Sequence, residues 1–305
     1  MFLQIAGISL HYMQKKAIIR YIHYLTALYF SFCHLPIGKC SFFVQKMHIE
    51  SQIMQRPSNP FVFTKKTVFM QRISDAVVNG AVRYIQGTIP VSKAGFFASK
   101  MKQRYEYDLS YKEASRKRKL GYATAKLLFW HPEKGCETLN WILLVTNGKF
   151  KDGVGLDEDW LDPKYKGGRI SVTNYRLTRI PSTFDTKPRW SWRYTRASYD
   201  GLRNDIVNAI RTKNDERLRQ LIYSIYKSPS FGGVREQVKS LVSLIKEEWK
   251  RTRGSKEGMP EIPKVLGYVR RLEDKGVRLI AIKIQLEKIE IFSKEHLDDM
   301  SEFYD

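Results

Sequence analysis

The chain has 305 residues, with 53 Lys and Arg against 31 Asp and Glu, which gives a formal charge of +22 and a pI of 9.8. A hydrophobic content of 43% is enough to build a core, so the composition excludes a largely disordered chain. So high a charge costs stability through self-repulsion, and a polyanionic partner relieves it. We therefore expect a nucleic acid as the partner; the alternative is an ordinary basic, soluble surface.

The three cysteines, Cys33, Cys40 and Cys136, are too few and too scattered for a disulfide scaffold. They indicate a reducing compartment, which predicts a cytoplasmic protein. Cys33 and Cys40 flank His34, but zinc sites normally show a second close pair of ligands. We expect no metal and no other cofactor.

Residues 1–53 differ from the rest and form an N-terminal extension. The run 17–33 is apolar, but it is interrupted by Arg20 and His23 and is shorter than the ~20 residues of a spanning helix. Three interpretations stay open: a weak membrane anchor, a buried helix, or residues upstream of the true start of the protein. We favour the third, and we expect no membrane contact unless the run proves to be an anchor.

Residues 54–284 are expected to form one domain, which begins with a turn-rich linker at 56–60. Helices are predicted over 74–105, in two parts that are separated near Gly87 and Pro90. Four adjacent cations follow at 116–119, where mutual repulsion predicts an exposed loop. This loop supplies the first candidate phosphate contacts, Arg116, Lys117, Arg118 and Lys119.

A sheet is predicted over 120–196. Tyr122–Trp130 and Leu139–Thr146 are apolar nearly throughout, which is typical of central, buried strands. Two further strands are expected at 169–179 and 189–196. Residues 164–196 hold nine Lys or Arg and one acid, the steepest local excess of positive charge in the chain.

The strand at 189–196 alternates strictly between two kinds of side chain. Trp190, Trp192 and Tyr194 share one face, which is either the core face of the sheet, as we favour for the tryptophans, or a platform on which single-stranded bases stack. Arginines occupy the opposite face and are the better candidates for phosphate contacts. The candidates are Arg189, Arg193 and Arg196, with Arg176 and Arg179 on the neighbouring strand.

Three helices are expected over 202–253. The last carries an apolar stripe that includes Val238, Leu241 and Ile245, and five cations lie within an arc of about 60° beside it. The free amides of Gly232 and Gly233 at its start suit a phosphate. The candidate contacts of this helix are Arg235, Lys239, Lys246, Lys250 and Arg253.

A hairpin is predicted over 265–284, turning at Asp274-Lys275-Gly276. Residues 285–305 form an acidic C-terminal tail, since 286–305 hold two Lys and seven acids. Together these elements predict an α+β fold: a mostly antiparallel sheet of four to six strands with a helical half packed against it.

The sequence contains no nucleotide-binding glycine loop, no serine-hydrolase elbow and no zinc-protease motif. The adjacent acids Asp157, Glu158 and Asp159 lack the spacing of a metal site and are expected to form a solvated loop. Tyr194 and Tyr199 lie among arginines, as a DNA-nicking tyrosine would. A metal-dependent or tyrosine-based nuclease is therefore the first alternative to a binding protein, and a structural subunit that binds an acidic protein is the second.

Three stretches, AVVNGAVRYIQGTIP (76–90), LNWILLVTNG (139–148) and SPSFGGVREQV (228–238), resemble parts of proteins carried by bacterial plasmids and integrative elements. The resemblance covers much of 76–250 and assigns no site residues. It implies a bacterial, DNA-handling context. We therefore expect a protein that binds nucleic acid, DNA rather than RNA, in the replication or transfer of a mobile element.

Overall fold

The computed structural model describes residues 57–150, 154–155, 158–181, 188–254, 257–264 and 266–301, with side chains as far as residue 291. The chain divides into two units, Met1–Gln55 and Arg56–Asp305, and every described residue lies in the second. The expectations for residues 1–53, including the apolar run and two of the three cysteines, lie outside the described residues.

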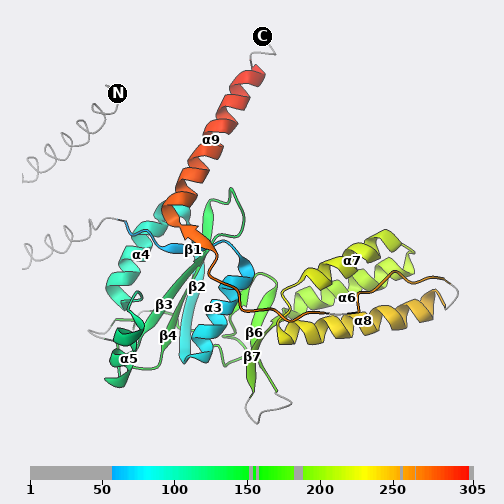
Figure 1. Ribbon diagram of the computed structural model, residues 1–305, viewed down its shortest axis with the longest axis horizontal. Coiled ribbons are helices and arrows are strands. Elements are labelled where there is room, and N and C mark those ends of the chain that lie inside the picture. Colours follow the sequence, from blue (N-terminus) through cyan, green and yellow to red (C-terminus); the bar gives the residue numbers. More distant parts are fainter. Residues whose placement is uncertain are drawn as a thin grey trace, which may run out of the picture. The chain divides into compact units, whose positions relative to one another are not determined.

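The described part of the chain is an α+β structure, as the sequence predicted (Figure 1). Its elements in chain order are β1 (Phe61–Phe63), α3 (Lys66–Val78), β2 (Ala81–Pro90), α4 (Val91–Tyr105), α5 (Tyr111–Lys119), β3 (Ala125–Trp130), β4 (Thr138–Thr146), β5 (Ser171–Val172), β6 (Tyr175–Ile180), β7 (Arg189–Tyr194), α6 (Arg196–Arg211), α7 (Asp215–Lys227), α8 (Gly232–Thr252), β8 (Gly276–Arg278) and α9 (Leu279–Ser301).

A five-stranded sheet in the order β2-β4-β3-β1-β8 forms the first half of the fold. Its pairs are antiparallel except for β1 and β3, which run parallel with Val62 opposite Phe129. β1 also pairs with β8, where Val62 lies opposite Val277. The sheet therefore joins elements from the two ends of the described chain.

Both faces of this sheet are covered by helices. Phe69 and Ile73 of α3 pack on one face, in a cluster with Ile142 of β4. α4 and the first turns of α9 cover the other face, where Met101 and Leu279 belong to the core cluster. Because successive residues of a strand point to opposite faces, a strand covered on both sides is apolar throughout. The prediction of buried central strands is confirmed in β3 and β4.

A separate three-stranded antiparallel sheet, β5-β6-β7, follows. Trp192 of β7 is fully buried, and its indole N–H lies 2.7 Å from Ser74 Oγ and 3.1 Å from the Met70 carbonyl of α3. The expectation of one sheet over 120–196 is therefore wrong: the strands divide between two sheets, and α3 lies against both.

α6, α7 and α8 form the predicted helical half (Figure 1). Ile210, Ile222 and Leu241, one from each helix, are buried in the same core cluster as α3 and the second sheet. Apolar residues of 262–272, the segment that returns the chain toward β8, pack against this cluster as well. We call residues 257–275 the return segment.

Two predictions near the start of the domain, a helix and a loop, are wrong. Residues 81–90 form strand β2 rather than a helix, because Asn79 and Gly80 end α3, Gly80 with a φ of 101° that favours glycine. Residues 116–119 lie in helix α5 rather than in a loop. Ser110 and Glu113 begin that helix with a capping box, in which each side chain bonds the other residue's backbone N–H.

The predicted hairpin at 265–284 is also wrong. Of the described residues in this range, only Gly276–Arg278 form a strand, and that strand pairs with β1. Leu279 and Ile282 are both buried at a helical spacing, so the chain continues as α9, which includes most of the expected acidic tail. Among the described residues, no helix is both long and apolar enough to cross a membrane.

Candidate nucleic-acid interface

The arginine-bearing face of β7 lies against the start of α8. Gly233 donates its backbone N–H to Ser191 Oγ at 2.9 Å, and a Cβ on Gly233 would lie 2.6 Å from the carbonyl oxygen of Trp192. The strand and the first turn of the helix are therefore in direct contact. The phosphate site predicted at the glycine pair is not available at Gly233, because a protein hydroxyl already accepts that amide.

Arg189 and Arg193 share one carboxylate across this junction. Their guanidinium nitrogens lie 3.7 and 3.9 Å from the two carboxylate oxygens of Glu236 on α8. The arginine side chains are 53% and 39% exposed. Arg176 lies opposite Arg193 on β6 and therefore shares its face. Two arginines thus share one carboxylate, which leaves the junction positively charged.

Arg179 does not belong to this face, contrary to the prediction. It lies opposite Trp190, with its guanidinium 5.9 Å from the Trp190 ring. Arg176 and Arg179 are three residues apart, and strand side chains alternate, so the two point to opposite faces. Arg196 lies beyond the strand, at the first position of α6, where it is 93% exposed and 3.5 Å from Asp200.

The aromatic face of β7 is mainly core. Trp192 and Tyr194 are buried, while Trp190 is half-buried, so the core interpretation is confirmed for the first two. The Tyr194 hydroxyl hydrogen-bonds Ser228, and burial raises the pKa of this phenol. A phenol that is buried and hard to ionise is a poor nucleophile, and Tyr199 packs against the same core.

Three of the five predicted cations on α8 are free to meet a ligand. Lys239, Lys246 and Lys250 are exposed and form no ion pair with any described residue. Their positions fall within an arc of about 40° on the helix, beside its buried side. They form a row that continues from the β7–α8 junction, because Lys239 is one turn beyond Glu236.

The other two α8 cations have partners within the protein. Arg253 is only 6% exposed: it bonds both oxygens of Asp215, pairs with Glu257 and lies 4.3 Å from the ring of Trp249. We remove it from the candidate contacts, because its donors are already satisfied. The guanidinium of Arg235 stacks 3.3 Å from the ring centre of Tyr268 on the return segment. That ring is 77% exposed.

Helix α5 presents a second set of cations and buries none of its residues. Lys117 is held by Glu106 at 2.7 Å, whereas Arg116, Arg118 and Lys119 are exposed. At 100° per residue, Arg116 and Lys119 share a side with Lys112 that lies away from Lys117. Cations in the last turn of a helix also interact favourably with the helix dipole, so these residues can stabilise α5 without binding a ligand.

Two lysines that the sequence did not single out face one hollow. Lys66 begins α3 and Lys227 ends α7, and the hollow of about 470 Å³ between them is also lined by Tyr175 and Tyr223. Burial lowers the pKa of Lys66, whose ammonium lies 5.3 Å from the Tyr175 ring centre. No sequence pattern connects residues 66 and 227, because only the packing of α7 beside the second sheet brings them together.

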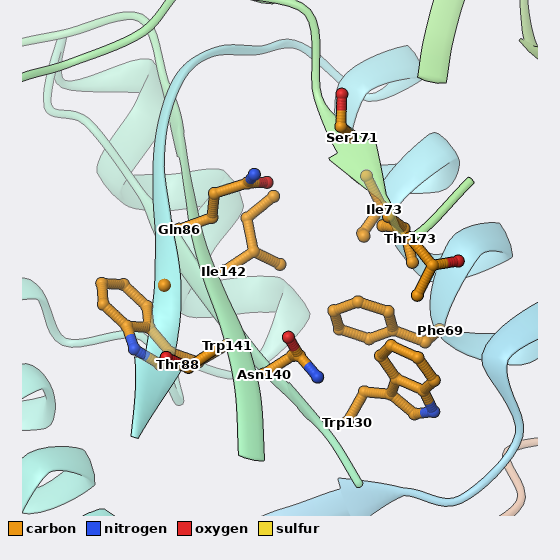
Figure 2. A pocket seen from close by; sticks show the side chains of 12 residues that line it. Phe69, Ile73, Gln86, Thr88, Trp130, Asn140, Trp141, Ile142, Ser171 and Thr173 are labelled. Atoms are coloured by element: carbon orange, nitrogen blue, oxygen red, sulfur yellow. The ribbon is translucent and has the colours of Figure 1, made fainter. Parts of the chain in front are cut away.

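A smaller cavity of about 190 Å³ lies between α3, the first sheet and β5. Figure 2 shows Gln86 and Asn140 extending from the sheet toward the space that Phe69 and Thr173 approach from the other side. None of the side chains that line it is charged, so this cavity does not suit a phosphate. Thr173 turns the chain between β5 and β6 with a φ of 48°, which is unusual for a β-branched residue.

The acidic loop is partly a structural support. Glu158 accepts hydrogen bonds from Arg104 at 3.1 Å and from the Tyr105 hydroxyl at 2.9 Å, which ties it to the end of α4. Among the residues that the structure describes, no three His, Cys, Asp or Glu side chains gather where they could hold a metal ion.

Comparison with known proteins adds no family to this description: no protein-family model, no curated protein and no solved structure matches the chain.

Proposed function

We propose that this protein binds nucleic acid through the β7–α8 junction and the lysine row of α8. The observation that carries the proposal is the row itself, Lys239, Lys246 and Lys250, which is exposed and without ion pairs among the described residues. Two of the three acids of the same helix have partners, since Glu236 faces the β7 arginines and Glu248 is bound by Arg211 and Arg251. The third, Glu247, lies about 100° around the helix from Lys246. Uncompensated lysines on one side of a helix suit a phosphate backbone.

The length of the row also suits a nucleic acid. Lys250 lies eleven positions after Lys239, which corresponds to about 16 Å along a helix. Arg189 and Arg193 extend the surface beyond its first residue. A row of this length spans several phosphates of one strand, which supports binding to a polymer rather than to a single small anion.

We assign the protein to the cytoplasm and to DNA, in the replication or transfer of a mobile element. The support for this part is the small number of cysteines and the sequence resemblance to proteins of plasmids and integrative elements. Of the two tyrosines considered as nucleophiles, Tyr194 is buried and Tyr199 is partly buried against the core, so binding rather than cleavage is the function that we propose.

Binding of labelled DNA by the full chain, measured by fluorescence anisotropy against salt concentration, tests the proposal. We expect the affinity to fall steeply with salt, and the DNA to remain intact with and without magnesium. In the Lys239→Gln/Lys246→Gln variant the slope of log K against log salt should become shallower by about 1.4 to 1.8, because each lost phosphate contact contributes about 0.7 to 0.9.

The matched control is Lys93→Gln/Lys100→Gln on α4, which removes the same charge from exposed lysines on the other side of the first sheet. An equal change of slope in both variants would contradict the assignment of the surface. Binding that does not depend on salt would refute the function, and magnesium-dependent nicking would favour a nuclease instead.

A further inference from the structure

The hollow between α3 and α7 has an unusual balance of charge. Lys66 and Lys227 both line it, and the described residues around it include no carboxylate. Lys66 is half-buried, and neither lysine forms an ion pair with a described residue. Each ammonium lies near a ring, Lys66 5.3 Å from the centre of Tyr175 and Lys227 5.2 Å from that of Tyr223, but the lining supplies neither with a counter-charge.

Burial makes the position of Lys66 costly. Desolvation lowers its pKa, and no neighbouring acid restores it. Exposed lysines normally keep the ammonium in water, so a half-buried ammonium whose neighbour is a ring and not a carboxylate is a feature that an anionic ligand would explain. An anion in the hollow would offset the desolvation of Lys66 and supply Lys227 with a counter-charge.

The rest of the lining supplies hydrogen-bond donors. The hydroxyls of Thr67 and Ser224 line the hollow and form no hydrogen bond with a described residue. α3 begins here without a side-chain cap and without an acid in its first turn, which adds the positive end of a helix dipole. Tyr223 stands at the hollow with a ring that is 65% exposed. This set of donors suits the oxygens of a phosphate, and the exposed ring suits a neighbouring base.

We propose that this hollow binds a terminal phosphate of the nucleic acid, with Lys66 and Lys227 as its two charged contacts. A terminal phosphate monoester carries close to two negative charges at pH 7, whereas each internal phosphodiester carries one. Two lysines match the monoester. The inference rests on the proposed function, since it identifies which part of the nucleic acid a second site takes.

The experiment compares single-stranded oligonucleotides of one sequence that end in a 5′-phosphate, a 3′-phosphate or hydroxyls at both ends. For the full-length wild-type chain we expect one phosphorylated form to bind at least about fivefold more tightly than the hydroxyl form. Lys66→Met and Lys227→Met should each abolish that preference while binding of the hydroxyl form stays salt-dependent. Lys227→Met guards against a folding defect, because Lys227 is exposed at the end of its helix.

Lys65→Met is the matched control, because it removes the same charge from an exposed neighbour that does not line the hollow. It should keep the preference. Equal affinity for all three oligonucleotides, or a preference that survives both hollow variants, would overturn the inference and leave the proposed function standing.

If no oligonucleotide binds, the proposed function is refuted. The melting temperature of the full chain with inorganic phosphate or a nucleoside monophosphate then tests whether the hollow binds phosphate. A rise in the melting temperature with either ligand, absent in Lys66→Met, would retain a phosphate site for free ligands. No rise with either would overturn it.

Discussion

Ser191 on β7 accepts the backbone N–H of Gly233 at the start of α8, and this 2.9 Å hydrogen bond fixes the helix against the strand. The contact is close because residue 233 has no side chain. It joins the two groups of cations that the sequence placed far apart, those of the strand and those of the helix.

Replacing Gly233 by Ala should destabilise the protein by about 1–3 kcal/mol, because the new Cβ would lie 2.6 Å from the Trp192 carbonyl oxygen and from Arg193 Cγ. Chemical denaturation measures this change. Gly232→Ala is the control: its Cβ would meet its nearest neighbour at 3.5 Å, an ordinary contact, so we expect a change within about 0.5 kcal/mol. Equal losses in the two variants would contradict the close approach at 233.

Lys66→Met should raise the melting temperature in the absence of nucleic acid, by about 1–3 °C, because it removes a half-buried charge without a counter-ion. Such a rise in melting temperature on replacement is typical of a residue that serves binding at a cost in stability. Differential scanning calorimetry gives the answer. A lower melting temperature would show that the ammonium stabilises the free protein.

The carboxylate of Glu248 should make the helical half sensitive to acid. Hydrogen bonds from Arg251 and Arg211 hold the pKa of Glu248 at about 2, below its ordinary value of 4.5. Because the folded pKa is depressed, the stabilisation is complete above pH 4.5 and is lost as the pH falls toward about 2.

Glu248→Gln should therefore lower the free energy of unfolding by about 1–3 kcal/mol at pH 7, and the difference from wild type should shrink between pH 4.5 and 2. Urea titrations at several pH values measure it. Glu247→Gln removes an exposed neighbour that forms no ion pair with a described residue, and it should show no such pH dependence.

Gln71 of α3 is one of the residues that hold the return segment in place, beside Arg72 and Asp75. Its side chain donates to the Arg270 carbonyl at 2.7 Å and accepts the Leu272 N–H at 3.1 Å. Gln71→Ala removes both bonds, so we expect a loss of about 1–3 kcal/mol and faster amide exchange at Leu272. Gln103→Ala, on an exposed side of α4, should change neither. Unchanged exchange at Leu272 would mean that other contacts hold the segment.

The sequence correctly predicted the elements in which a short, continuous pattern of apolar residues is buried. β3, β4 and α8 follow from their apolar patterns alone. The prediction failed where the spacing of apolar residues fits both a helix and a strand. Residues 81–90 fit a helix if the end of α3 at Asn79 and Gly80 is not recognised. Leu279 and Ile282 fit a strand unless it is known that α4 packs beside them.

The candidate site shows the same limit. Alternation placed Arg189 and Arg193 on one face of β7 correctly, but it could not show that Arg253 is held by Asp215, 38 residues earlier. Nor could it bring Lys66 to Lys227, since that proximity depends on the tertiary packing of α7 beside the second sheet. Contacts between residues distant in sequence carry no short-range signal.

The pairing of β1 with β8 has a consequence for the order in which the chain assembles. Thr64 beside β1 and Lys275 beside β8 are hydrogen-bonded although they lie 211 residues apart. At ribosomal rates of about 5–20 residues per second, the outer edge of β1 therefore stays open for roughly 10–40 s after that strand is made. During that interval β1 exposes unpaired amides and carbonyls that another strand can join, and α9 has not yet covered the sheet. Among the described strands, the last to be synthesised thus closes the first, and the helix that directly follows it completes the adjoining layer of the core.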